Sequence, residues 1–329
     1  MSDLSNLVRA ICKRGAAILA TALVAPTLAA SETVQIPGPE GPLEGEQIAV
    51  DGARSTVVIV PGSGPTDRNG NSNVSPLQSD TYKLLAEELA AAGIASIRID
   101  KRGFFGSQGA IADPNDVTVS AYASDVLGWL DFAADQGAAC TWIAGHSEGG
   151  LVALAAAQMD PDGLCGIVLL AAPGRPVGDL LLEQVRRNPA NAPFMAEIES
   201  LVAQLSAGHT RDVAKISPEL LPLFSEGPQR FMADLFSYDP AGLARDWAGP
   251  TLIVQGDADV QVAKRDADLL QSAFKRPQRL DLDGGTHMLK QDVPGQPFAT
   301  YVQPELPLHP DLVEGIAAFI SAKVPRDTP

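Results

Sequence analysis

The stretch TWIAGHSEGGLVAL, residues 141–154, decides the fold. An apolar run typical of a strand leads into Gly145-His146-Ser147-Glu148-Gly149, and an apolar run typical of a helix follows. A G-x-S-x-G pattern in this position predicts a strained strand-to-helix turn that presents the serine. Glycines two residues to either side of Ser147 allow the two backbones to pack closely. We therefore expect Ser147 to be a nucleophile; the competing interpretation is a simple glycine-rich turn.

Outward from this turn, short apolar runs alternate with longer amphipathic segments. The apolar runs predict strands at residues 56–60, 94–99, 140–144, 167–170, 251–254 and 278–282. The amphipathic segments predict helices at residues 82–92, 120–134, 151–158, 264–274 and 310–323. Near-continuous apolar strands separated by helices indicate a parallel sheet with helices on both faces. The expected fold class is α/β, with a mostly parallel central sheet in one contiguous domain over residues 31–329.

The alternation stops between residues 173 and 249, where helix-like pieces at 180–187, 194–205 and 229–236 are separated by prolines. An interruption of 77 residues is far longer than an ordinary connection, so we expect a helical cap inserted above the sheet. Apolar side chains of the cap either line an acyl or leaving-group pocket or form the cap's own small core. They are Leu180, Leu181, Leu182, Phe194, Met195, Leu221, Leu223, Phe224, Phe231, Met232 and Phe236.

A serine is a weak nucleophile until a base takes its proton, so a histidine is expected nearby. His146 adjoins the serine and points elsewhere on the turn, and His209 lies in the cap insertion. His309 precedes the last predicted helix. His287 follows the final predicted strand in a loop at the carboxyl edge of the sheet, which makes it the expected base.

The acid of such a site follows the next-to-last strand and precedes the histidine. Asp257 and Asp259 both follow the strand predicted at 251–254. One of them must accept a hydrogen bond from the imidazole and hold its tautomer. We favour Asp259, and Asp257 is the alternative.

Acyl transfer also needs two backbone N–H donors where an oxyanion forms. The amide of Glu148, directly after the nucleophile, is the first candidate. The turn Pro61-Gly62-Ser63-Gly64-Pro65 follows the first central strand, and its glycines allow close approach of the backbone. Ser63 N–H is the second candidate; the alternative is a plain turn.

These segments together resemble the α/β-hydrolase superfamily from about residue 45 to the C-terminus. PGSGPTDR at 61–68 and DKRGFFGS at 100–107 are similar to segments of a group of bacterial serine esterases. QGDADVQV at 255–262 resembles their acid loop, in which the second aspartate is catalytic, and THMLK at 286–290 resembles their histidine loop. Pro61 departs from the pattern, because the group usually has histidine there.

The resemblance implies an α/β-hydrolase fold and a carboxylesterase or a serine-aminopeptidase-like hydrolase. The expected activity is two-step cleavage of short-to-medium acyl esters by Ser147, His287 and Asp259, without a metal or an organic cofactor. One rival is amide hydrolysis by the same residues, with an acidic anchor for the substrate amine such as Glu183, Glu197 or Glu199. A second rival is a non-catalytic binding protein. The pair Asp67-Arg68 either binds a carboxylate or phosphate or forms structural ion pairs.

The composition excludes some classes of binding partner. The 329 residues include 24 Lys+Arg and 40 Asp+Glu, a formal net charge of −16, with 45% hydrophobic residues as in a globular protein. This balance disfavours nucleic acid and anionic membrane surfaces, which attract clustered Lys and Arg. Three cysteines and four histidines show no zinc-site spacing. We expect a small-molecule ester as the partner and no nucleic acid.

The first thirty residues have the order of a secretory signal peptide: Arg9, Lys13 and Arg14, then an apolar run over 16–25, then small residues. The alternative is an uncleaved N-terminal anchor. Removal of residues 1–30 leaves 21 Lys+Arg and 39 Asp+Glu, a net charge of −18. We expect an exported, periplasmic or secreted protein without stable membrane association after removal of the signal. Cys140 and Cys165 open neighbouring strands and are either a disulfide or two buried thiols.

Overall fold

The central sheet has eight strands. In the computed structural model, which describes residues 30–323, they lie in the order β1-β2-β4-β3-β5-β6-β7-β8. The strands are β1 Ser31–Ile36, β2 Leu43–Ile48, β3 Ser55–Val60, β4 Ala95–Ile99, β5 Cys140–His146, β6 Leu164–Leu170, β7 Thr251–Gly256 and β8 Gln278–Leu282. Strands β3 to β8 pair in parallel, whereas β2 pairs antiparallel with both β1 and β4. The predicted α/β class with a mostly parallel sheet is confirmed.

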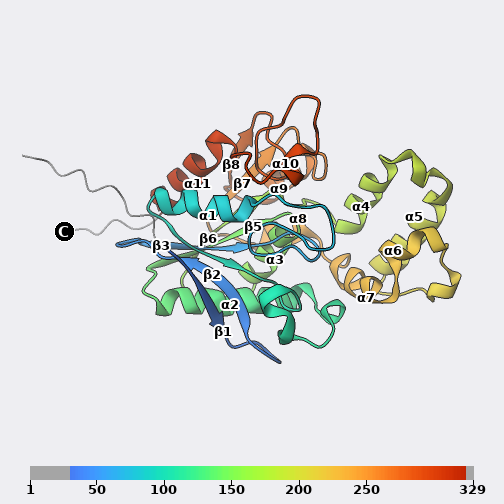
Figure 1. Cartoon of the computed structure of the whole chain (residues 1–329), viewed down its shortest axis with the longest axis horizontal. Helices are drawn as coiled ribbons and strands as arrows, with labels where there is room; N and C mark the ends of the chain where they lie inside the picture. The colour runs from blue at the N-terminus through green and yellow to red at the C-terminus, as the bar shows by residue number, and fades with distance from the viewer. Residues whose placement is uncertain (1–29, 324–329) are drawn as a thin grey trace, which may run out of the picture.

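Helices cover both faces of this sheet (Figure 1). On one face lie α1 Thr81–Ala91 and α11 Pro310–Lys323, and α2 Val119–Asp135 and α3 Glu148–Ala157 lie on the other. The helix α8 Pro240–Asp246 packs against α3 and against α9 Lys264–Ala273. No helix within residues 30–323 has the length and apolar character needed to cross a membrane.

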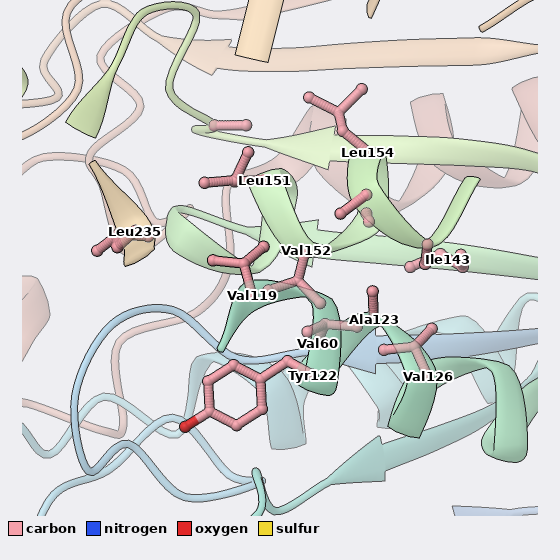
Figure 2. Packing of buried hydrophobic residues seen from close by; sticks show 14 of the residues in the cluster. Val60, Val119, Tyr122, Ala123, Val126, Ile143, Leu151, Val152, Leu154 and Leu235 are labelled. Carbon is pink, nitrogen blue, oxygen red and sulfur yellow. The ribbon is translucent and has the colours of Figure 1, made fainter. Parts of the chain in front are cut away.

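Each central strand contributes side chains to two separate hydrophobic cores, because successive side chains point to opposite faces of the sheet. In β3, Val58 and Val60 pack toward α2 and α3, while Val57 and Ile59 pack toward α1 and α11. Figure 2 shows the first of these cores, where Val60 lies near Tyr122 of α2. Full burial on both faces explains why the strands read as unbroken apolar runs.

The segment expected as a cap forms helices beyond the carboxyl ends of the parallel strands. They are α4 Val177–Arg186, α5 Met195–Ser206, α6 Leu221–Phe224 and α7 Glu226–Leu235, whereas α8, in the same predicted segment, packs against α3 and α9. Figure 1 shows these four helices standing to one side of the sheet and its covering helices. We refer to them as the cap helices. The short helix α10 Ala299–Val302 lies in the long loop that follows β8.

A disulfide joins the beginnings of two neighbouring strands. Cys140 begins β5, Cys165 lies at the start of β6, and their Cα atoms are 5.6 Å apart. The sequence left open a disulfide or two buried thiols, and the structure has the disulfide. Residues 1–29 of the predicted signal peptide lie outside the described part of the chain.

Candidate active site

Ser147 lies at the junction of β5 and α3, in a backbone conformation that few residues adopt. Its φ is 54° and its ψ is −122°, and its N–H donates to the carbonyl of Leu170 at 2.9 Å. A Cβ at Gly145 would meet the carbonyl of Gly149, and one at Gly149 would meet the carbonyl of Val60. Both flanking positions therefore require glycine, because any side chain would push the strand and the helix apart. The strained turn presents the serine to the cavities described below.

The loops after β7 and β8 bring His287 and Asp259 together. His287 Nδ1 lies 2.8 Å from Asp259 Oδ2, and both side chains are buried. The other oxygen of Asp259 accepts from the N–H groups of Gln261 and Val262, at 2.7 and 2.9 Å. Burial raises the pKa of Asp259, but the charge of His287 and these hydrogen bonds outweigh it and hold that pKa below its ordinary value.

This contact also sets the tautomer of His287. An ionised carboxylate can only accept, so Nδ1 carries the proton and Nε2 is left as the basic nitrogen. Asp257, the alternative acid, lies outside this contact. Its carboxylate accepts from the N–H of Gly284 at 2.6 Å and caps the loop that leads to the histidine.

Ser63 and Glu148 lie next to the serine with their backbone amides uncommitted. Within residues 30–323, neither N–H donates a hydrogen bond to another group of the protein. A Cβ at Gly62 would lie 3.2 Å from the Cβ of Ser147, so the turn after β3 approaches the nucleophile closely. The arrangement leaves two donors free for an oxygen atom beside Ser147.

Two buried polar side chains support this centre, and the sequence did not single them out for that role. Lys101 Nζ donates to the carbonyl of Gly62 at 2.7 Å and to Glu148 Oε1 at 2.9 Å. The Tyr82 hydroxyl accepts from the N–H of Gly62 at 3.0 Å and lies 2.7 Å from His146 Nδ1. Lys101 was visible only as part of a loop motif, and no pattern marks a buried tyrosine hydroxyl.

His146 connects the serine turn to the histidine loop. Its Nε2 lies 2.7 Å from the carbonyl of His287, so Nε2 donates and Nδ1 accepts from Tyr82. Burial, together with the neighbouring charge of His287, lowers the pKa of His146 to about 3. His146 is therefore a neutral structural link at ordinary pH. Both of its ring nitrogens are engaged by these contacts, so His146 is not free to act as the base for Ser147.

Arg68 and Asp67 form separate structural contacts. The Arg68 guanidinium lies within 3.6 Å of Glu44, Glu46 and Asp100. Asp67 accepts from backbone N–H groups of its own turn. Of the two roles left open for this pair, the structural one fits these contacts. Among residues 30–323, no group of three or more His, Cys, Asp or Glu side chains could hold a metal ion.

Two cavities meet at Ser147. The larger, which we call the cap cavity, has a volume of about 490 Å³ and lies between Ser147 and the cap helices. The smaller, which we call the histidine pocket, has a volume of about 100 Å³ and is lined by His287, Met288 and Tyr82. Ser63, Ser147 and Gln261 line both.

The apolar residues of the cap divide between the two roles that the sequence left open. Six of them line the cap cavity, namely Leu180, Leu181, Leu223, Phe231, Met232 and Phe236. The other five lie outside its wall: Phe224 is buried in the hydrophobic core, and Leu182, Phe194, Met195 and Leu221 are partly buried and pack against that core. The cavity wall is therefore predominantly apolar where the cap closes over the serine.

Comparison with known proteins gives one family match and one curated relative. A family model described as serine aminopeptidase, S33, matches residues 77–214. Esterase EstD from Thermotoga maritima is 26% identical over 217 residues, which are 65% of this chain and 48% of that protein. The chain thus spans about half the length of this relative.

Solved structures share the fold over most of the chain. A thermophilic esterase from Thermogutta terrifontis is 19% identical with a TM-score of 0.55, covering 88% of this chain and 98% of that one. Est1E from Butyrivibrio proteoclasticus is 16% identical with a TM-score of 0.56, over 88% and 98%. The α/β hydrolase GrgF from Penicillium sp. sh18 is 15% identical with a TM-score of 0.57, over 89% and 99%. Together with the sheet order, these structural likenesses show that the chain has the α/β-hydrolase fold.

Proposed function

We propose that the chain is a serine hydrolase that cleaves carboxylic esters with short-to-medium acyl groups. One observation carries the proposal. Ser147, on its strained turn, borders both the pocket lined by His287 and the cavity lined by Glu148. A nucleophile, a base oriented by Asp259 and two oxyanion donors thus surround one space, which is the set that acyl transfer requires.

The reaction follows from the proton positions. Ser147 Oγ attacks the ester carbonyl while His287 Nε2 takes its proton, and the Asp259 carboxylate stabilises the imidazolium. The carbonyl oxygen, now an oxyanion, accepts from the N–H groups of Ser63 and Glu148. His287 then gives the proton to the leaving alkoxide, and an acyl-enzyme remains on Ser147. Water repeats the sequence on the acyl-enzyme and releases the acid.

The proposal places the two halves of the substrate in the two cavities. Because His287 protonates the leaving alkoxide, the alcohol must lie beside it, in the histidine pocket. The acyl group then extends into the cap cavity, whose wall does not include His287. A water molecule takes up about 30 Å³, so the histidine pocket holds about three water-sized groups. The favoured substrates are esters of small alcohols with apolar acids.

The wall of the cap cavity favours an ester over an aminoacyl amide. Among the described residues, its only carboxylate is Glu148, which is engaged by Lys101. Glu183, Glu197 and Glu199, the candidate anchors for a substrate amine, lie outside both cavities and accept from arginine or serine side chains. A protonated amine in this predominantly apolar cavity would have to compete with Lys101 for Glu148, at a high desolvation cost.

Labelling and kinetics of one matched pair of variants test the proposal. Ser147→Ala is expected to lower kcat/KM on p-nitrophenyl butyrate by about 10³-fold or more and to abolish labelling by a fluorophosphonate. Ser272→Ala, on an exposed turn of α9, should keep both at the wild-type level. Parallel assays with an aminoacyl p-nitroanilide compare amide with ester cleavage. A wild-type chain without ester hydrolysis and without a label would favour a non-catalytic binding protein.

We also propose that the protein is exported to the periplasm or secreted. The disulfide between Cys140 and Cys165 supports this, because such bonds persist in oxidising compartments. Cell fractionation of the full chain and of a chain that lacks residues 1–30 tests it. The full chain is expected outside the cytoplasm and the shortened one inside. Equal retention of both in the cytoplasm would contradict export.

A further inference from the structure

We propose that Lys101 is a positioning residue of the oxyanion hole, acting through the carbonyl of Gly62. Lys101 lies in the loop after β4, is 3% exposed, and donates to Gly62 O at 2.7 Å. The carbonyl of Gly62 and the N–H of Ser63 belong to the same peptide unit. The lysine therefore holds the peptide that supplies one of the two oxyanion donors. The inference rests on the proposed acyl-transfer function.

Peptide geometry fixes the direction of the donor. The described residues contain no cis peptide bond, so the Gly62 carbonyl and the Ser63 N–H point in opposite directions across a planar unit. When Lys101 holds the carbonyl on its side, the N–H must point away from it, and Ser63 lines both cavities beside Ser147. A rotated peptide would remove the donor from the oxyanion.

The positive charge also strengthens the donor. A hydrogen bond from an ammonium group to a carbonyl is charge-assisted and polarises the peptide, which makes its N–H a better donor. The site is buried, so water does not screen this effect. The second side of Gly62 is held as well, since its N–H donates to the Tyr82 hydroxyl at 3.0 Å. Two buried side chains thus fix Gly62 where Pro61 offers no N–H of its own.

Lys101 also contacts Glu148, the residue whose backbone N–H is the second proposed oxyanion donor. The Glu148 carboxylate lies 2.9 Å from Lys101 Nζ. One ammonium group therefore links the two chain segments that supply the donors, the turn after β3 and the start of α3. A competing view is that Lys101 only neutralises the buried Glu148 carboxylate. The two views differ in what happens when both charges are removed together.

The test compares Lys101→Met, Glu148→Leu, the double variant and Lys101→Arg. Lys101→Met is expected to lower kcat on p-nitrophenyl butyrate by about 10- to 100-fold, somewhat less than the loss of a whole oxyanion donor, with KM within about threefold. Affinity for an alkylboronic acid, whose tetrahedral serine adduct mimics the oxyanion, should fall by the same factor. Lys101→Arg should recover part of both losses, because a guanidinium still donates to the two acceptors.

The double variant separates positioning from charge pairing. It should regain the melting temperature lost in Lys101→Met, because no unpaired buried carboxylate remains, yet keep the low kcat and the weak boronic acid binding. A double variant with wild-type kcat would overturn the positioning role alone. A wild-type chain that neither hydrolyses the ester nor takes the fluorophosphonate label would overturn the proposed function, and Lys101 positioning with it.

Discussion

The two aspartates after β7 differ in what their carboxylates accept, so their removal should differ in effect. Asp259 faces His287 Nδ1 at 2.8 Å, whereas Asp257 accepts a backbone N–H from Gly284. An amide in place of Asp259 would offer an N–H to His287 or favour its wrong tautomer, so Asp259→Asn should lower kcat by about 10³- to 10⁴-fold. Asp257→Asn keeps an acceptor oxygen and should stay within about threefold. Turnover of p-nitrophenyl butyrate measures both, and the reverse order would make Asp257 the acid.

His146 should make the fold sensitive to acid. Its pKa of about 3 in the folded protein lies below the ordinary value of 6.5. Between these two values the histidine is protonated in the unfolded chain and remains neutral in the folded one. The free energy of unfolding should therefore fall as the pH drops from 6.5 toward 3, by about 3 kcal/mol at pH 4 from this residue alone. His146→Gln can still contact Tyr82 and the His287 carbonyl but cannot titrate. Urea unfolding at pH 7 and pH 4 should show a smaller loss in the variant; equal losses would contradict this assignment.

At the scale of elements, the sequence predicts the buried parts of the fold and the edge strand β8, and it misses the two N-terminal strands. The strands β3 to β7 are apolar because helices cover both faces, which makes them visible as runs. The strand β1 lies at the edge of the sheet and β2 beside it; they read SETVQI and LEGEQI and bury only single or roughly alternate side chains, so no apolar run marks them. The G-x-S-x-G turn is predictable because backbone contacts demand glycine there. The roles of Lys101 and Tyr82 are not predictable, because a contact made by one isolated side chain creates no repeating pattern in the sequence.

The disulfide between β5 and β6 closes a covalent loop of the chain that includes α3. Cys140 and Cys165 are 25 residues apart, and closing a loop of this length in the unfolded chain contributes about 3 kcal/mol to stability. Replacement of both by alanine should therefore lower the free energy of unfolding in urea by about that amount. Dithiothreitol should lower the stability of the wild type and leave the double variant unchanged. A wild type that is insensitive to the reductant while fully reduced would contradict a stabilising bridge.

Over the whole molecule, the net charge is −16, and the charges at the centre do not offset it. Lys101 pairs with Glu148, and the Asp259 carboxylate beside His287 has the same sign as the acidic surface, so the field felt by an approaching substrate is negative. A neutral ester approaches without steering, and its kcat/KM should be the same at 10 mM and 500 mM NaCl. A p-nitrophenyl monoester of a dicarboxylic acid carries a negative charge and is repelled at low salt. Its kcat/KM should rise by about two- to ten-fold over the same range, because salt screens the repulsion. A fall with added salt would instead reveal a cationic entrance, and with it a preference for acidic substrates that the apolar cap cavity does not suggest.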